Sequence, residues 1–161
     1  RDARAYLQSL PAVPTFDMIF GDAFHDIAIP QHLVTREFHD EIARRLNPDG
    51  FYAINAVDSG RDPRFLMALV KTLYQTFNSV EVWAESEDIN RHGRVTFLVI
   101  ASNRRIDRSV LIAKRGLDRS WARWPVGDIK ALIGKPSVIL LSDDFAPVDR
   151  LMSGLLLSPD R

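Results

Sequence analysis

The sequence predicts an α/β fold in which helices cover a mostly parallel sheet. Three observations lead to this prediction. Short apolar runs of strand length alternate with longer segments whose apolar residues recur at helical spacing. Turns that contain glycine or proline separate the two kinds of segment. The resulting order, β, α, β, α, β, β, is typical of a parallel sheet with helices on its faces, and the last two runs predict an antiparallel hairpin at its edge.

The first elements are a short helix and a buried strand. The helix is expected over residues 3–10, and Pro11 and Pro14 end it because proline lacks a backbone donor and clashes with the preceding turn. The strand is expected over residues 16–20, where the run FDMIF is short and mostly apolar. A loop from Asp22 to Gln31 is expected to follow this strand.

The second helix is predicted over residues 35–46, with Thr35 as its cap. Its apolar stripe repeats every four residues and consists of Val34, Phe38, Ile42 and Leu46. The sequence Asn-Pro-Asp-Gly at 47–50 is expected to stop the helix and form a turn. The next strand is expected over residues 51–57, followed by a polar loop at 58–61.

The third helix is expected to open with Asp62 as its cap and Pro63 at its first position. Its apolar residues have strong helical spacing and are Phe65, Leu66, Leu69, Val70, Leu73 and Phe77. Two strands, at 79–85 and 95–101, are then predicted to form the closing hairpin.

The last third of the chain gives weaker patterns. Four features are expected there: a helix over 107–114 capped by Asp107, an aromatic loop with Trp121, Trp124 and Pro125, a short helix over 127–133, and an apolar run at 137–141 that leads into the sequence SDDFAP. The pair Asp143–Asp144 has two interpretations, a structural turn or part of an acceptor pocket, and the turn is favoured because Pro147 and Asp144 suit it.

Composition excludes several classes of function. The chain has 161 residues, enough for one domain with a core, and its formal net charge is zero, which gives no overall case for nucleic-acid binding. It contains no cysteine, so disulfides, thiolate nucleophiles and cysteine-based zinc sites are excluded. No apolar run approaches the ~20 residues of a membrane span, and no signal peptide is recognised. The opening residues read as the interior of a fold, so we expect a fragment of a longer chain.

Asp22 is the main candidate for chemistry. The predicted strand ends at Gly21, so Asp22 is the first residue of the following loop. Ligands of open α/β sheets bind just past the carboxyl ends of the strands, which is where Asp22 is expected to lie. Taken without its context, Asp22 would be interpreted as a solvated loop residue.

The strings FDMIFGDAFHD and REFHDEIARRLNPDGFYAIN resemble the spermidine synthase family of aminopropyltransferases. That family carries a similar strand, an aspartate-rich loop, and a helix that ends in LxPxG. The resemblance implies a Rossmann-like S-adenosylmethionine-dependent methyltransferase fold. Residues 1–103 would be the C-terminal half of this domain, residues 104–161 a helical and extended tail packed on it, and the first strands would be missing, which leaves an exposed edge.

The resemblance also implies an activity, the transfer of an aminopropyl group from decarboxylated S-adenosylmethionine to an amine such as putrescine, without a metal. Asp2 and Ala3 match a motif whose aspartate contacts the adenine amino group. Asp22 matches the aspartate that orients the attacking amine or accepts its proton, because an amine is mostly protonated near neutral pH. His25 and Asp26 would shape the acceptor pocket.

Two departures from the family pattern keep alternatives open. His25 and Asp26 stand where the family's DxxDP loop has its second aspartate and proline. The family's glycine-rich GxGxG loop is not in this sequence. The alternatives are an S-adenosylmethionine-dependent methyltransferase and a non-catalytic domain that binds a nucleoside or polyamine, so whether the chain is an enzyme stays open.

The expected partner is a small amine, with no nucleic acid, and the expected assembly is a homo-oligomer. The expected location is the cytoplasm, or the cytoplasmic face of a membrane if the parent chain carries spans, since the sequence SDDFAPVDRL resembles the end of spermidine-synthase-like proteins fused behind membrane spans. Three histidines, His25, His32 and His39, are spaced seven residues apart. Surface or capping roles are favoured for them, because zinc needs three or four converging ligands.

Overall fold

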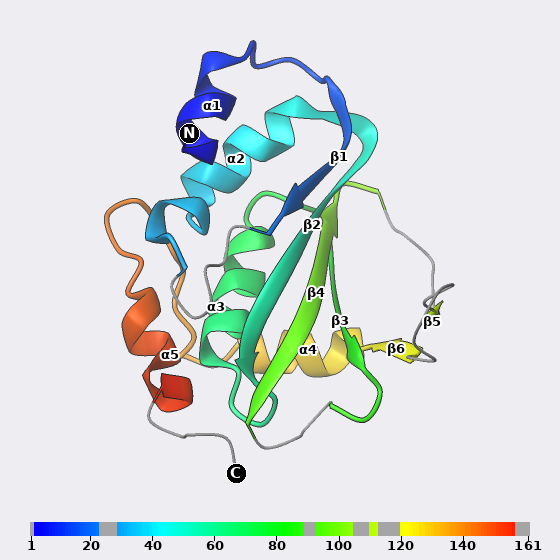
Figure 1. The fold of residues 1–161 in the computed structure, drawn as a ribbon, viewed down its shortest axis with the longest axis vertical. Helices are drawn as coiled ribbons and strands as arrows, with labels where there is room; N and C mark the ends of the chain where they lie inside the picture. The colour runs from blue at the N-terminus through cyan, green and yellow to red at the C-terminus, as the bar shows by residue number, and fades with distance from the viewer. Residues whose placement is uncertain (1, 23–28, 89–92, 105–109, 113–119, 157–161) are drawn as a thin grey trace.

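The computed structural model describes residues 2–22, 29–88, 93–104, 110–112 and 120–156. One six-stranded sheet has the order β1-β2-β4-β3-β6-β5 (Figure 1). The strands are β1 (Phe16–Gly21), β2 (Leu46–Ser59), β3 (Ser79–Glu85), β4 (Arg94–Ser102), β5 (Val110–Ile112) and β6 (Ser120–Arg123). β1 and β2 are parallel, and the pairs β2–β4, β3–β4, β3–β6 and β5–β6 are antiparallel. The predicted closing hairpin is therefore present as β3 and β4.

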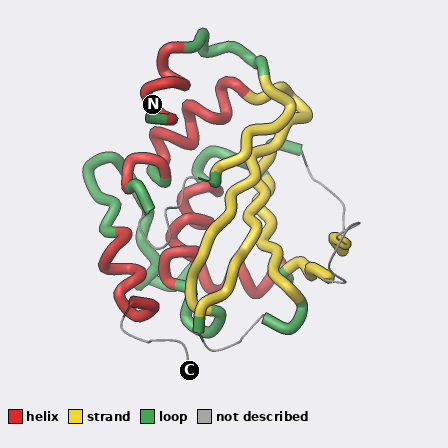
Figure 2. Tube along the Cα trace, viewed as in Figure 1, coloured by secondary structure: helices red, strands yellow, loops and turns green. Residues whose placement is uncertain are grey.

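The helices form a second layer beside the sheet (Figure 2). They are α1 (Ala3–Ser9), the 3-10 helix η1 (Gln31–Leu33), α2 (Arg36–Arg45), α3 (Arg64–Leu73), α4 (Val126–Ile133) and α5 (Val148–Leu156). α3 packs on β2, and both α4 and α5 pack on α3, while α1 packs on α2. Eight of the ten residues of α3 are buried for this reason, so α3 is the centre of the core. No helix in the described ranges has the length and apolar character that a membrane crossing requires.

The helix α2 begins and ends as predicted. Thr35 Oγ1 accepts a hydrogen bond from the Phe38 amide at 3.3 Å, which is the expected cap. The prediction of a free turn at residues 47–50 was wrong, because these residues belong to β2. Phe16 pairs with Leu46 and Met18 pairs with Phe51, so residues 47–50 form a large bulge in β2 opposite Asp17.

The cap of α3 differs from the prediction. Asp58, at the end of β2, accepts a hydrogen bond from the Leu66 amide at 2.8 Å. Asp62 instead pairs with the Arg64 side chain at 2.8 Å, and Pro63 lies just before the helix rather than in its first turn. The residue that caps α3 is therefore not the one next to the helix in the sequence. Asp58 is eight residues before Leu66, and the fold brings its carboxylate to the Leu66 amide.

The tail also departs from the predictions in part. Residues 110–112 form the strand β5, so the helix predicted over 107–114 was wrong there, and its remaining residues lie outside the described ranges. Trp121 lies in β6 rather than in a loop. Trp124 follows β6 and stacks on Phe97 with ring centroids 6.2 Å apart. The short helix expected over 127–133 is present as α4.

Candidate functional site

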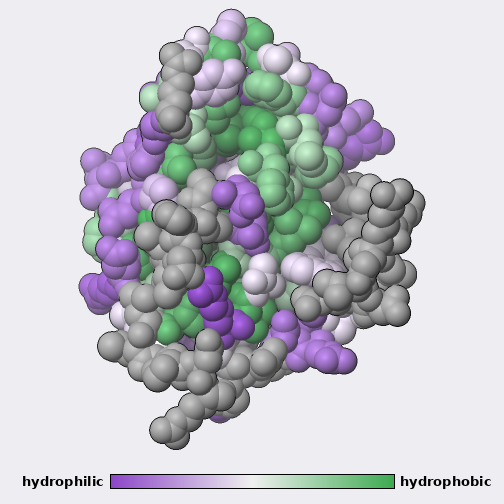
Figure 3. Space-filling model, viewed as in Figure 1, coloured by the Kyte–Doolittle hydropathy of each residue, from purple (hydrophilic) through white to green (hydrophobic). Residues whose placement is uncertain are grey.

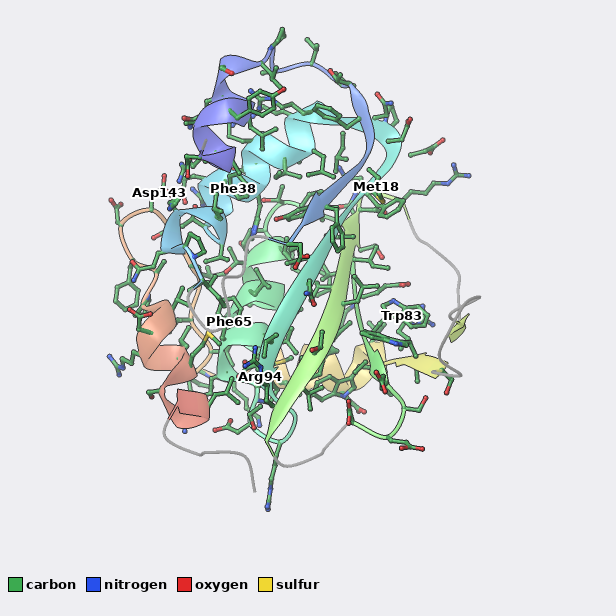
Figure 4. All side chains as sticks on the ribbon, viewed as in Figure 1. Met18, Phe38, Phe65, Trp83, Arg94 and Asp143 are labelled. Carbon is green, nitrogen blue, oxygen red and sulfur yellow. The ribbon has the colours of Figure 1, made fainter. Side chains whose placement is uncertain are left out.

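An apolar pocket of about 490 Å³ lies between α1, β1, η1 and α2. β1 is at the edge of the described sheet, and its Met18 and Phe20 side chains are each 54% exposed. Apolar side chains gather on the molecular surface in this region (Figure 3), and Figure 4 labels two of the pocket-lining residues, Met18 on β1 and Phe38 on α2. The pocket is thus bounded by an open strand edge on one side and by helices on the other.

Asp22 lies at the mouth of this pocket, directly after the carboxyl end of β1. Asn55 of β2 donates a hydrogen bond from Nδ2 to Asp22 Oδ1 at 3.0 Å. Among the described residues that line the pocket, Asp22 is the one with a charged side chain. Asp22 is exposed to solvent, and a carboxylate at an apolar pocket can pair with the cationic end of a ligand whose apolar part fills the pocket.

Gly21 lets the backbone before Asp22 lie close to Tyr52. A Cβ atom at position 21 would be 2.7 Å from Tyr52 Oη, which is too close for any larger residue without a shift. Asn55 was missed by the sequence reasoning. The available signal was a polar residue within the apolar run FYAINAV, and the pairing of Gly21 with Ile54 places Asn55 next to Asp22.

Asp2 and Ala3 lie at the start of α1. Ala3 lines the pocket, so the structure brings it to the same cavity as Asp22. Asp2 caps α1 by accepting a hydrogen bond from the Ala5 amide at 2.8 Å, and its other oxygen is 2.6 Å from His32 Nε2. The bonds from Ala5 and His32 lower the pKa of Asp2. Each carboxylate oxygen can accept a second bond, so these contacts leave acceptor capacity for a ligand.

Burial keeps Tyr52, which lines the pocket, and its neighbour His39 uncharged. Burial raises the pKa of Tyr52, which lines the pocket, and lowers the pKa of His39 to about 3. The His39 ring lies 6.0 Å from that of Tyr52, and neither of its nitrogens has a hydrogen-bond partner. Both side chains are therefore neutral near pH 7. Among the described residues that line the pocket, neither Tyr52 nor any other side chain adds a charge to that of Asp22.

Two of the predicted site residues, His25 and Asp26, lie outside the described residues. His32 and His39 do not converge, since His32 bonds to Asp2 and His39 is fully buried beside Tyr52. Within the described ranges no group of three His, Asp or Glu side chains is arranged to hold a metal ion.

Comparison with known proteins identifies the fold. No protein-family model matches the sequence, and no curated protein matches it significantly. A solved structure of a probable spermidine synthase from Corynebacterium glutamicum ATCC 13032 matches with a TM-score of 0.66 and 20% sequence identity, over 91% of this chain and 54% of that chain. A structure of MNMC2 from Aquifex aeolicus matches with a TM-score of 0.54 and 21% identity, over 97% of this chain and 42% of that chain.

These similarities confirm the predicted Rossmann-like α/β fold class. The expectation of a mostly parallel sheet was wrong for the described strands, because β1–β2 is their one parallel pair and the other four pairs are antiparallel. The chain has the Rossmann-like α/β fold of the S-adenosylmethionine-dependent methyltransferase type to which spermidine synthases belong. The chain spans about half the length of the solved structures that it matches.

Proposed function

We propose that this chain carries the acceptor side of a transferase site and moves an aminopropyl group from decarboxylated S-adenosylmethionine to an amine such as putrescine. The observation that carries the proposal is the position of Asp22, the charged side chain at an apolar pocket that Ala3 also lines. The similarity of the fold to a spermidine synthase supports a sulfonium-dependent transferase.

The pocket fits part of such a donor. Its volume of about 490 Å³ lies in the range of small-molecule sites, and its walls are apolar, as a nucleoside ring and a methylene chain require. Ala3 and Asp22 both line the pocket, and Asp2 directly precedes Ala3 at the start of α1. In the family, a glycine-rich loop forms the other side of the nucleoside site, and that loop is not in this sequence. Under this proposal, the residues of this chain therefore supply one side of the site.

The bound donor would supply a carbon made electrophilic by its sulfonium. Asp22 holds the acceptor amine at the carboxyl edge of the sheet and accepts the proton that the nitrogen loses as it forms its new bond to carbon, while the carbon–sulfur bond breaks and sulfur keeps the electron pair. Asn55 fixes the orientation of Asp22 through the 3.0 Å hydrogen bond. Correct alignment of nitrogen, carbon and sulfur supplies much of the rate, so a fixed carboxylate is an advantage.

Two alternative functions have specific support. The replacement of the family's second aspartate and proline by His25 and Asp26 favours either a different acceptor, as in a methyltransferase, or binding without turnover. The proposal also includes a cytoplasmic location and a homo-oligomeric assembly. Separate assays with decarboxylated S-adenosylmethionine and with S-adenosylmethionine distinguish the two enzymes, because each should consume one donor.

The test compares Asp22→Asn with Asp17→Asn in the natural protein that contains this chain. Both aspartates belong to the β1 region and both accept a hydrogen bond from an asparagine of β2, since Asn47 Nδ2 is 2.7 Å from Asp17 Oδ1. Asp17 does not line the pocket, so it is a matched control. Loss of the proton acceptor should lower kcat by about a hundredfold or more in Asp22→Asn and leave Asp17→Asn unchanged.

Full activity of Asp22→Asn would contradict the proposal. If the natural protein binds methylthioadenosine but consumes neither donor, the non-catalytic alternative is correct instead.

A further inference from the structure

The segment 137–147, which we name the C-terminal strap, runs across three helices before α5 begins. Its first contacts are with α3. Lys71 Nζ donates to the Val138 carbonyl at 2.6 Å, and the Leu141 amide donates to Thr72 Oγ1 at 2.9 Å. Leu141 is fully buried, so the strap is anchored in the core at this point.

The strap then meets the start of α2. The Arg36 amide donates to the Leu141 carbonyl at 3.0 Å, and the Asp143 amide donates to Glu37 Oε2 at 3.0 Å. Thr35, the cap of α2, donates its hydroxyl proton to Asp143 Oδ1 at 2.7 Å. Asp143 is therefore held from two sides by the first residues of α2.

The last contact of the strap is with α1. Arg4 donates to both carboxylate oxygens of Asp143, at 2.7 Å and 2.5 Å, and also to the His32 carbonyl at 3.2 Å. The Arg4 side chain is 17% exposed, so this bidentate pair is partly shielded from water. The Arg4 guanidinium lowers the pKa of Asp143. Figure 4 shows Asp143 beside the end of α1 where the chain begins.

α1 depends on such contacts because it is weak alone. It has seven residues, of which Leu7 is buried, and isolated helices of that length are not stable in water. Arg45 Nη2 donates to the Leu10 carbonyl at 3.0 Å and holds its C-terminal end. The N-terminal end, with Asp2 and Ala3, is held by the Arg4–Asp143 pair and by the contact of Asp2 with His32.

We infer that Asp143 is a positioning residue for nucleoside binding: through Arg4 it fixes the first turn of α1, and with it Asp2 and Ala3, against the pocket. This inference rests on the proposed function. It assigns a role in the site to the tail of the chain, which the resemblance to the family's site motifs did not cover. Asp143 itself touches no ligand in this arrangement and acts through Arg4.

The experiment is a calorimetric titration of methylthioadenosine into the natural protein and four variants. Asp143→Asn and Arg4→Gln should each raise the Kd by about tenfold, a coupling of ordinary size between connected sites. The double variant should raise the Kd no further, because both single changes remove the same pair. Asp144→Asn is the matched control, since Asp144 is the exposed neighbour of Asp143, and its Kd should not change.

Two further readouts separate positioning from general destabilisation. Amide hydrogen exchange should become faster in α1 of Asp143→Asn and stay unchanged in α3 and β2. The KM for the amine should also stay unchanged, because Asp22 is held by Asn55 and not by the strap. If Asp143→Asn does not fold, Arg4→Gln alone carries the same test.

The outcomes distinguish the two proposals. Absence of methylthioadenosine binding by the unmodified protein would overturn the proposed function, and this inference with it. Binding that is equally tight in Asp143→Asn and Arg4→Gln would overturn this inference alone. Faster exchange throughout the core would also overturn it, since the role of Asp143 would then be general stability.

Discussion

His39 is a buried histidine without a polar partner. Its side chain is fully buried on α2 next to Phe38 and Tyr52, and both ring nitrogens lack hydrogen bonds. Burial lowers its pKa from the ordinary value of 6.5 to about 3. Because the unfolded chain binds the proton more readily, the contribution of His39 to stability is present above pH 6.5 and is lost as the pH falls toward 3.

The variant His39→Leu should therefore be more stable than the natural chain. Removing unsatisfied buried nitrogens should raise the free energy of unfolding by about 1–3 kcal/mol at pH 7.5. The difference should grow at pH 5, where protonation of His39 favours the unfolded natural chain. Urea unfolding at the two pH values measures both effects. Equal differences at both values would show that His39 does not titrate as described.

At the scale of one helix, α3 depends on a carboxylate from the preceding strand. Asp58 Oδ2 accepts from the Leu66 amide at 2.8 Å and Oδ1 accepts from the Ser59 amide at 2.7 Å. Burial nevertheless raises the pKa of Asp58 to about 7, because it outweighs these bonds. The contribution of this carboxyl to stability is therefore present below its ordinary pKa and is lost as the pH rises through about 7.

Asp58→Ala and Asp62→Ala test which residue caps α3. Asp58→Ala should lower the free energy of unfolding by about 1–2 kcal/mol, the usual cost of a lost helix cap. Asp62→Ala should have little effect, because Asp62 is exposed and pairs with another exposed side chain, Arg64. Urea unfolding at pH 6 measures both variants. The opposite order of effects would restore Asp62 as the cap.

At the scale of the whole molecule, the open edge of the sheet is the main feature. Within the described residues β1 pairs with β2 alone, and its Met18 and Phe20 are each 54% exposed beside the apolar pocket. An edge strand that is paired on one side only and carries exposed apolar side chains is a template for pairing with another chain. The expectation of an exposed edge agrees with this arrangement.

The double variant Met18→Lys/Phe20→Lys should self-associate less than the unchanged 161-residue chain. Lysine on an edge strand opposes pairing because its charge would have to be desolvated. Phe145→Lys is the control, since Phe145 is 53% exposed but lies in the C-terminal strap, away from β1. Sedimentation velocity of the three chains over a range of concentrations measures the association. Equal association of all three chains would contradict an edge-mediated contact.

Much of the fold could be predicted because its local patterns are strong. The helical spacing of Phe65, Leu69 and Leu73 marks α3, and the apolar runs mark β3 and β4 within one residue of their observed bounds. The position of Asp22 followed from a strand that stops at glycine. These features depend on neighbours in the sequence, which a single chain displays directly.

The features that escaped prediction depend on distant residues. The bulge at 47–50 brings Gly50 close to the backbone of β1, where a Cβ atom would be 3.0 Å from the Phe16 carbonyl oxygen. The capping role of Asp58 and the bond from Asn55 to Asp22 require knowledge of the register and of the path of the chain. The spacing of residues along the sequence gives no direct signal for contacts between distant residues, so these contacts could not be predicted from it.

The bond between Arg4 and Asp143 also sets an order of events during protein synthesis. The two residues are separated by 139 positions, so Asp143 leaves the ribosome long after Arg4. At ordinary elongation rates this interval is on the order of ten seconds. Until then the first turn of α1 lacks its ionic partner. The Arg4–Asp143 contact that holds α1 can therefore form only after residues 1–143 have been translated.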